Sequence, residues 1–164
     1  MSQHKNVSAE EIIKLLDLKP HPEEGGFFSE TYRSGDKIAE LDRCFSTTIY
    51  YLITPNTYSA MHRVKSDETF HFYLGDPVDQ LQLYPDGSGK IVTIGNNLVA
   101  GERPQVLVPR GVWQGARLKP GGSLALFGCT VAPGFEFADY EHGNRANLIQ
   151  QFPKFKEQIV DLTR

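Results

Sequence analysis

The chain has 164 residues, with 40% hydrophobic and 23% charged content, which is the size and composition of one soluble globular domain over residues 1–164. Its 17 Lys plus Arg against 20 Asp plus Glu give a net charge of -3, so it offers no general electrostatic attraction to nucleic acid or to anionic lipid. Met1–Asn6 lacks the apolar core of a secretory signal, and Cys44 and Cys129 form no CxxC pair, so we expect a cytoplasmic protein.

The first predicted element is a helix with an explicit start signal. Ser8 and Glu11 have the spacing of a capping box, and the isoleucines and leucines that follow supply an apolar face. Pro20 removes a backbone donor and biases the preceding residue toward extended conformations. The sequence therefore predicts a helix over about 9–18.

From Phe27 onward, apolar residues alternate with polar ones in short runs that Pro and Gly residues interrupt, a pattern typical of strands joined by tight turns. About ten short strands favour an antiparallel sandwich or barrel over about 27–133. After Pro133 we expect two short helices within about 147–162. The strands are predicted at 27–33, 44–53, 58–63, 68–74, 79–84, 90–94, 97–99, 105–108, 113–117 and 123–132.

Two segments, 56–75 and 101–114, carry the most informative spacing. They resemble the two motifs of the cupin superfamily: His62, Glu68 and Gly75 match the first motif, and the Pro-x-Gly at 109–111 matches the second. The chain departs from the motifs at four positions, and the Gly at 101 lies two residues farther from the Pro than usual. The departures are Asn56 for the first Gly, Val64 for the second His, Gln114 for the third His and Leu118 for the Asn.

Other segments resemble an uncharacterised single-domain cupin family of bacteria and yeast, and together they span most of residues 8–160. The resemblance implies a mainly β fold, the double-stranded β-helix or jelly-roll barrel, with an N-terminal helix and short C-terminal helices. It also implies a homodimer and a distant similarity to deoxysugar-nucleotide epimerases. The segments are Glu24–Phe27, Glu30–Arg33, His62–Glu68, Gly75–Pro77, Val108–Gln114 and Pro133–Asp139.

His62 and Glu68 are the first candidates for chemistry. Their numbering on two successive strands allows both side chains to converge on one face, and a carboxylate beside an imidazole suits a general acid or base. From the residues alone a polar pair at a sheet rim is the favoured alternative, whereas the resemblance implies that His62 faces the barrel pocket. Tyr50 is a candidate acid partner for His62.

Several further residues are candidates for ligand binding, each with a plain structural alternative. The Arg33 guanidinium suits a carboxylate or phosphate, or else a surface ion pair. Trp113 suits stacking on a ring or core packing, and Asp139 suits orienting a base or capping a helix. His71 is expected on the opposite strand face from Glu68, as a polar neighbour. Phe70 and Phe72 share the parity of Glu68 and are expected in the pocket floor.

A metal is not expected. The typical cupin site offers three His and one Glu, a set suited to divalent transition metals. Only His62 and Glu68 remain here, with Gln114 as a weak oxygen donor, so these three residues are the ligand set if any such metal binds.

Three functions stay open from the sequence. The first is a metal-independent isomerase or epimerase of a carbohydrate-like metabolite, such as a sugar or sugar nucleotide, with His62 as acid/base. The second is a small-molecule binding or sensing module without turnover. The third is a metal-dependent oxygenase or isomerase.

Overall fold

The N-terminal helix starts where the sequence predicts. In this computed structural model, which describes residues 7–164, α1 spans Ala9–Leu15, and both hydrogen bonds of the Ser8 and Glu11 capping box are present. The helix ends earlier than predicted because Asp17 adopts φ 49° and the chain then extends to pair with β2. The expectation concerning Met1–Asn6 lies outside the described residues.

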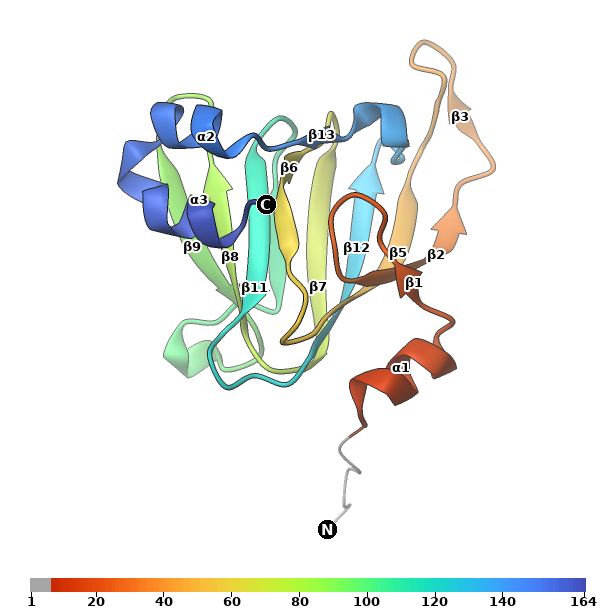
Figure 1. Cartoon of the computed structure of the whole chain (residues 1–164). Coiled ribbons are helices and arrows are strands. Elements are labelled where there is room, and N and C mark those ends of the chain that lie inside the picture. The colour runs from red at the N-terminus through yellow and green to blue at the C-terminus, as the bar shows by residue number, and fades with distance from the viewer. Residues whose placement is uncertain (1–6) are drawn as a thin grey trace.

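The body of the protein is two antiparallel sheets packed face to face (Figure 1). The six-stranded sheet has the order β1-β2-β5-β12-β7-β10, and the five-stranded sheet has the order β13-β6-β11-β8-β9. This arrangement confirms the expected mainly β, jelly-roll fold. The strands are β1 Lys19–Pro20, β2 Phe27–Arg33, β5 Thr47–Ile53, β6 Ser59–Arg63, β7 Asp67–Gly75, β8 Val78–Leu83, β9 Gly89–Ile94, β10 Gln105–Val108, β11 Trp113–Leu118, β12 Ala125–Ala132 and β13 Glu141–His142.

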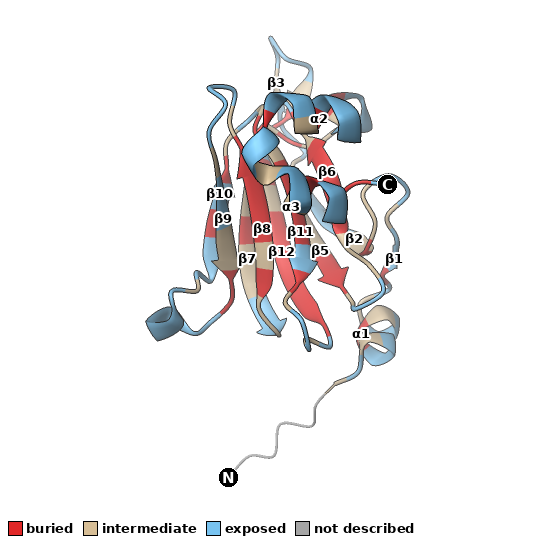
Figure 2. Cartoon of the chain, turned by 60° about the vertical axis from the view of Figure 1, so that its left-hand side comes forward, coloured by how far each residue is buried: buried red, intermediate tan, exposed pale blue. Residues whose placement is uncertain are grey.

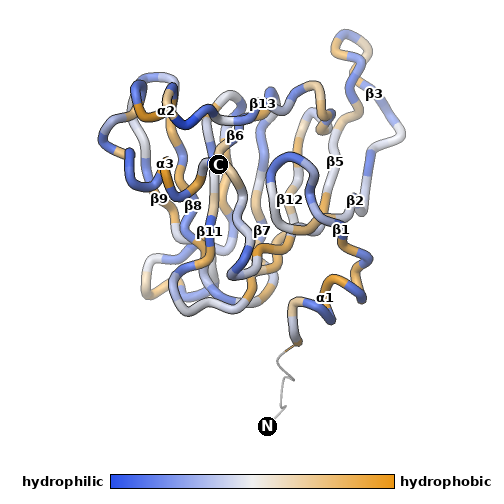
Figure 3. Tube along the Cα trace, viewed as in Figure 1, coloured by the Kyte–Doolittle hydropathy of each residue, from blue (hydrophilic) through white to orange (hydrophobic). Residues whose placement is uncertain are grey.

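The main core fills the space between the sheets, where alternate side chains of facing strands meet. Figure 2 shows the buried residues running along the strands of both sheets, and Figure 3 shows hydrophobic and hydrophilic residues alternating along the chain. On β5 the inward positions include Tyr51 and Ile53, while on β12 they include Phe127 and Cys129. Inward-facing polar residues are therefore exceptions that need a reason.

Helices cover the outer surfaces. The C-terminal helices α2 (Arg145–Gln151) and α3 (Lys156–Asp161) pack on the five-stranded sheet through a second apolar cluster that includes Met61, Leu148 and Ile159. Helix α1 packs through a third cluster that includes Leu52 and Leu126. None of the helices within residues 7–164 is long and apolar enough to cross a bilayer.

The structure corrects some predicted elements. The segment at 97–99 is no strand: Leu98–Ala100 forms a 3₁₀ turn, because the Asn97 side chain accepts from the Ala100 N–H and Gly101 takes φ 88°. The sequence reading also missed the two-residue strand β13, which pairs with β6, and the small hairpin of β3 (Lys37–Ile38) with β4 (Arg43–Cys44). Such short pairings carry no periodicity to detect.

Candidate active site

A small cavity of about 40 Å³ lies inside one end of the barrel. His62 enters it from β6 and Glu68 from β7, so the two sheets present these side chains toward each other. His62 and Glu68 thus meet across the barrel from two different sheets, whereas the sequence predicts them on one face of two successive strands. The remaining lining residues are His21, Glu24, Phe28, Thr47, Ile49, Val64, Cys129, Val131, Phe135 and Tyr140.

His62 has a defined orientation and tautomer. Its side chain is buried, and Nδ1 lies 2.7 Å from the carbonyl oxygen of Ala60. Because a carbonyl oxygen only accepts hydrogen bonds, Nδ1 carries the proton in the neutral ring and Nε2 keeps its lone pair. Nε2 lies 3.8 Å from Oε2 of Glu24. Neutral His62 therefore presents a proton acceptor toward the cavity.

Glu24 reaches the cavity from the loop between β1 and β2. The loop is tied to β6 by the Ala60 N–H, which donates to the Glu24 carbonyl oxygen over 2.9 Å, while the Ser59 hydroxyl donates to Glu24 Oε1. Gly26 adopts φ 69°, and a Cβ there would lie 2.8 Å from the Leu52 carbonyl oxygen. Only glycine fits this close approach, which brings Glu24 into the barrel.

His21 lies on the other side of the same carboxylate, with its Nε2 at 3.8 Å from Glu24 Oε2. Its Nδ1 accepts from the Glu24 N–H over 2.8 Å, so neutral His21 carries its proton on Nε2, opposite to His62. Burial lowers the pKa of His21 and outweighs the attraction of Glu24. Neutral His21 is thus a donor toward Glu24.

Glu68 is buried and protonates readily. Burial, helped by the negative charge of Glu24, raises its pKa to about 7 against the opposing effects of His62 and Gln114. At neutral pH the carboxyl group therefore exists in both protonated and ionised forms. Such a group can give or take a proton without a large cost.

A chain of buried amides holds Glu68. The Gln114 amide donates from Nε2 to Glu68 Oε2 over 2.7 Å. Gln80 donates to Gln114 over 3.4 Å, Gln82 to Gln80 over 2.8 Å, and the Tyr84 hydroxyl to Gln82 over 2.7 Å. Because every donor points the same way, the chain keeps the Gln114 NH₂ group directed at Glu68 and its oxygen turned toward Gln80. Each buried nitrogen and oxygen of these side chains thus has a hydrogen-bond partner, as burial requires.

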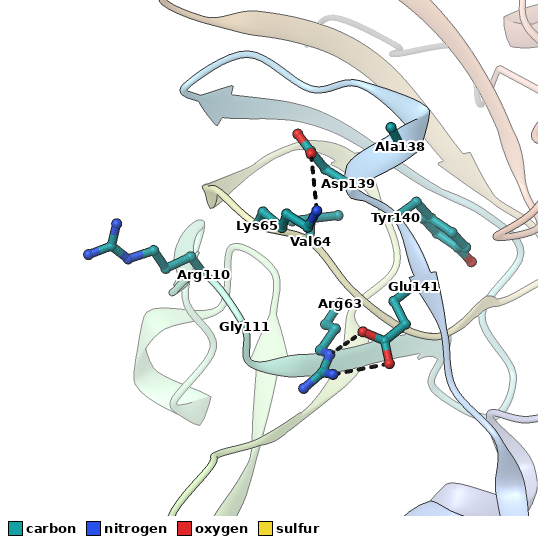
Figure 4. Close-up of a pocket in the computed structure, with 9 residues that line it drawn as sticks. All are labelled: Arg63, Val64, Lys65, Arg110, Gly111, Ala138, Asp139, Tyr140 and Glu141. Carbon is teal, nitrogen blue, oxygen red and sulfur yellow. Dashed lines mark hydrogen bonds and ion pairs between the residues drawn. The ribbon is translucent and has the colours of Figure 1, made fainter. Parts of the chain in front are cut away.

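Tyr140 and Val64 separate the cavity from a wider cleft of about 560 Å³ at the barrel mouth, because both residues line both spaces. The Tyr140 ring stacks on His62 with centroids 5.1 Å apart and an interplanar angle of 15°. Figure 4 shows the cleft, with Tyr140 on one side and the ion pairs Lys65 to Asp139 and Arg63 to Glu141 across it.

Comparisons with known proteins agree with this architecture. The profile of a family described as Cupin superfamily (DUF985) matches residues 10–143. The chain belongs to this cupin family. An uncharacterized protein of Saccharomyces cerevisiae, YML079W, is 31% identical over 149 residues, which cover 81% of this chain and 74% of the yeast protein.

Two solved structures resemble this cupin over nearly its whole length. A hypothetical protein from Leishmania major has a TM-score of 0.89 at 33% identity, covering 96% of this chain and 99% of its own. Protein SO0799 from Shewanella oneidensis has a TM-score of 0.89 at 35% identity, covering 96% and 98%. An oxalate decarboxylase from Bacillus subtilis matches at 16% identity with a TM-score of 0.55, covering 89% of this chain and 37% of its own, which shows the fold alone.

Three predicted site residues lie outside the cavity on the six-stranded sheet. The prediction that Tyr50 partners His62 is wrong, because Tyr50 packs on the outer face with the α1 cluster. Arg33 is engaged by Glu30 and Glu136 and by the Phe135 carbonyl oxygen, so it ties β2 to residues 135–136 instead of facing a ligand. His71 lies on the outer face, near Gln105 and Thr130, as its parity predicts, and not among the residues that line the cavity.

The other predicted binding residues have mainly packing or ion-pair roles. Phe70 and Phe72 belong to the barrel core, each against Phe127, rather than to the cavity wall. Trp113 faces the C-terminal helices, with the Arg63 guanidinium 4.5 Å above its ring. Asp139 caps no helix: it pairs with Arg43 over 2.9 Å and lines the outer cleft.

The residues at the typical cupin metal positions do not form a suitable ligand set. Val64 lines the cavity and has no ligating atom, and the Gln114 oxygen accepts from Gln80 on the side away from Glu68. Within residues 7–164, no three His, Cys, Asp or Glu side chains come together as a metal-binding group. We therefore derive no chemical step through a metal.

Sequence reasoning missed Glu24, His21 and Tyr140. The segment Glu24-Gly25-Gly26 belongs to the family resemblance, but the sequence alone gives no role to Glu24. The two adjacent glycines were a signal, because a pair with positive φ, here 98° and 69°, allows a loop to approach another backbone closely. No pattern in the sequence indicates that Tyr140 reaches His62.

Proposed function

We propose that this cupin binds a small, polar, carbohydrate-like metabolite at the His62 cavity in the cytoplasm and isomerises or epimerises it by proton transfer beside a carbonyl group. One observation carries the proposal: neutral His62 presents its unprotonated Nε2 to a cavity shared with Glu68, whose pKa is about 7. The two groups are suited to opposite roles, one accepting a proton and the other giving one.

The proposed step keeps atoms and electrons in balance. His62 Nε2 takes the proton from the carbon, the C–H electron pair forms a C=C bond, and the carbonyl oxygen gains the charge of an enolate. In an epimerisation, protonated Glu68 then gives its proton to that carbon from the opposite side of the cavity, where the C=C electron pair forms the new C–H bond and the enolate oxygen becomes the carbonyl oxygen again. In an isomerisation, the hydroxyl proton of the deprotonated carbon moves to the enolate oxygen, the Glu68 proton goes to the former carbonyl carbon, and the deprotonated carbon becomes the new carbonyl carbon. Glu24 stabilises the His62 cation that forms. The substrate is neither oxidised nor reduced, and proton exchange with water restores His62 and Glu68.

Entry of a substrate requires Tyr140 to move. A cavity of about 40 Å³ holds little more than a water molecule, whereas the cleft beyond Tyr140 has about 560 Å³. Swinging this ring off His62 joins the two spaces.

The state of the cysteines supports the proposed location in the cytoplasm. Cys44 and Cys129 are both free thiols, and the reducing cytoplasm favours free thiols over disulfides.

Solvent deuterium tests the proposal. Aldose and ketose phosphates, uronic acids and 2-keto acids are incubated in D₂O, and loss of the C–H signal is followed by NMR. The wild type is expected to exchange one position in at least one compound, and His62→Gln to slow this exchange by about 10²-fold or more. His71→Gln on the outer face is the matched control. Exchange that survives in His62→Gln contradicts the proposal, and binding without exchange favours the non-catalytic binding module.

We also propose a homodimer that forms through β2. β1 pairs only with Phe27 and Phe28, so the outer edge of β2 from Ser29 onward has no partner strand within residues 7–164. An open edge favours pairing with another chain. The chain is expected to sediment as a dimer at micromolar concentration, and Thr31→Pro to shift it toward the monomer. A wild-type monomer under these conditions contradicts the proposal.

A further inference from the structure

The outer cleft carries more positive charge than its ion pairs neutralise. Arg63, Lys65 and Arg110 line it, with Asp139 and Glu141 as the acidic residues on its wall. Arg63 is fully engaged, since its guanidinium donates two hydrogen bonds to Glu141 over 2.7 and 3.0 Å. The surplus therefore lies with Lys65 and Arg110.

Asp139 does not neutralise this surplus. Its carboxylate already accepts two hydrogen bonds from Arg43, over 3.1 and 2.9 Å, and the Lys65 ammonium is 4.0 Å away. No carboxylate within residues 7–164 lies within ion-pair distance of the Arg110 guanidinium, and Figure 4 shows its side chain extending away from both ion pairs. The cleft wall has three cationic and two anionic side chains, and one of the two carboxylates is already paired with Arg43 from outside the wall, on a protein of net charge -3.

The cavity behind Tyr140 has the opposite character. Glu24 and Glu68 both line it, and their mutual repulsion is one reason why the pKa of Glu68 is raised. A group that is anionic before it binds is repelled from that cavity, whereas the cleft attracts it. The enolate of the proposed reaction forms there only together with the His62 cation. A ligand with a neutral end and an anionic end is therefore oriented by the two spaces together.

We propose that the cleft at Lys65 and Arg110 binds the anionic oxygen group, phosphate or carboxylate, of the metabolite. Arg suits such groups because its planar guanidinium matches two oxygens, and Lys adds a mobile point charge. The placement of the other end of the ligand at His62 rests on the proposed function, but binding of the anion does not. The substrates would then be sugar phosphates or sugar acids, and neutral sugars would bind weakly.

Binding of the anion is tested by titrating simple anions and following the intrinsic fluorescence of Trp113. Trp113 is the single tryptophan, and Arg63, which lines the cleft, lies 4.5 Å above its ring. Inorganic phosphate and acetate are titrated separately at constant ionic strength, with ³¹P NMR as a second readout for phosphate. We expect saturable binding of at least one anion, and the comparison of the two distinguishes phosphate from carboxylate.

Charge-removing variants locate the binding. Lys65→Gln with Arg110→Gln is expected to raise the dissociation constant about tenfold or more. Lys154→Gln with Arg103→Gln removes the same charge from exposed positions elsewhere and is expected to change it less than twofold. His62→Gln is expected to bind the anion normally, which separates this proposal from the proposed reaction. Absence of binding in the wild type, or an equal loss in both double variants, overturns the proposal.

Discussion

Glu68→Gln is expected to be more stable than the wild type above pH 7, by up to about 3 kcal/mol in the free energy of unfolding. The reason is that the wild type buries a carboxyl group whose charged form the site disfavours. Glutamine is neutral at every pH and keeps an oxygen that can accept from Gln114, which donates to Glu68 in the wild type.

The stability of the wild type falls with rising pH because the folded and unfolded states bind different numbers of protons. Burial raises the pKa of Glu68 from 4.5 to about 7, so the folded state binds more protons than the unfolded state between these values. Stability from Glu68 is complete below about pH 4.5 and is lost progressively as the pH rises to about 7. The variant lacks this loss, so the two proteins diverge over that window and then differ by a constant amount.

Urea unfolding between pH 4 and pH 9 measures the effect. Glu40→Gln, at an exposed position, is the matched control and is expected to follow the wild type. If the two stability curves of wild type and Glu68→Gln run parallel from pH 4.5 to 7, Glu68 is not a neutral acid in the folded protein. On the proposed mechanism the same variant loses its proton donor, so added stability and loss of product formation would occur together, as is common at functional sites.

Within a single strand, the alternation of side chains predicts which residues face inward as soon as the direction of one side chain is known. The parity of Glu68 correctly put Phe70 and Phe72 on its face and His71 on the other. Parity does not relate one strand to another, however, because that depends on how the sheets pack. This is why Tyr50 was wrongly expected near His62, whereas the adjacent Tyr51 faces the barrel interior.

For a related reason, local sequence patterns do not predict that Glu24 lies beside His62. Glu24 belongs to a loop 38 residues before His62 in the chain, and only tertiary contacts bring it within 3.8 Å. The sequence predicts that Glu68 orients His62, whereas in the structure the Glu68 carboxyl group accepts a hydrogen bond from Gln114. Loops carry many functional residues, and their placement is the part of a fold that periodicity says least about.

Glu24→Gln is expected to have two separate effects on the site. The first is on Glu68: because the charge of Glu24 helps to raise the pKa of Glu68, removing that charge is expected to lower this pKa from about 7. The ¹³C signal of the Glu68 carboxyl group, followed from pH 4 to 9, reports the change without any substrate. Glu23→Gln, its exposed neighbour, is the matched control and is expected to leave the titration unchanged.

The second effect is on proton transfer. The new amide keeps an oxygen for the Ser59 hydroxyl and turns its NH₂ group toward His62 Nε2, where it donates to the lone pair that the base needs. Loss of the negative charge also removes stabilisation of the His62 cation. We expect deuterium exchange to fall by about 10²-fold or more, with His62 still protonated at Nδ1 in its ¹⁵N spectrum. If exchange stays at the wild-type rate while the Glu68 titration shifts, the carboxylate that serves His62 is Glu68, and the role of Glu24 is confined to electrostatics at Glu68.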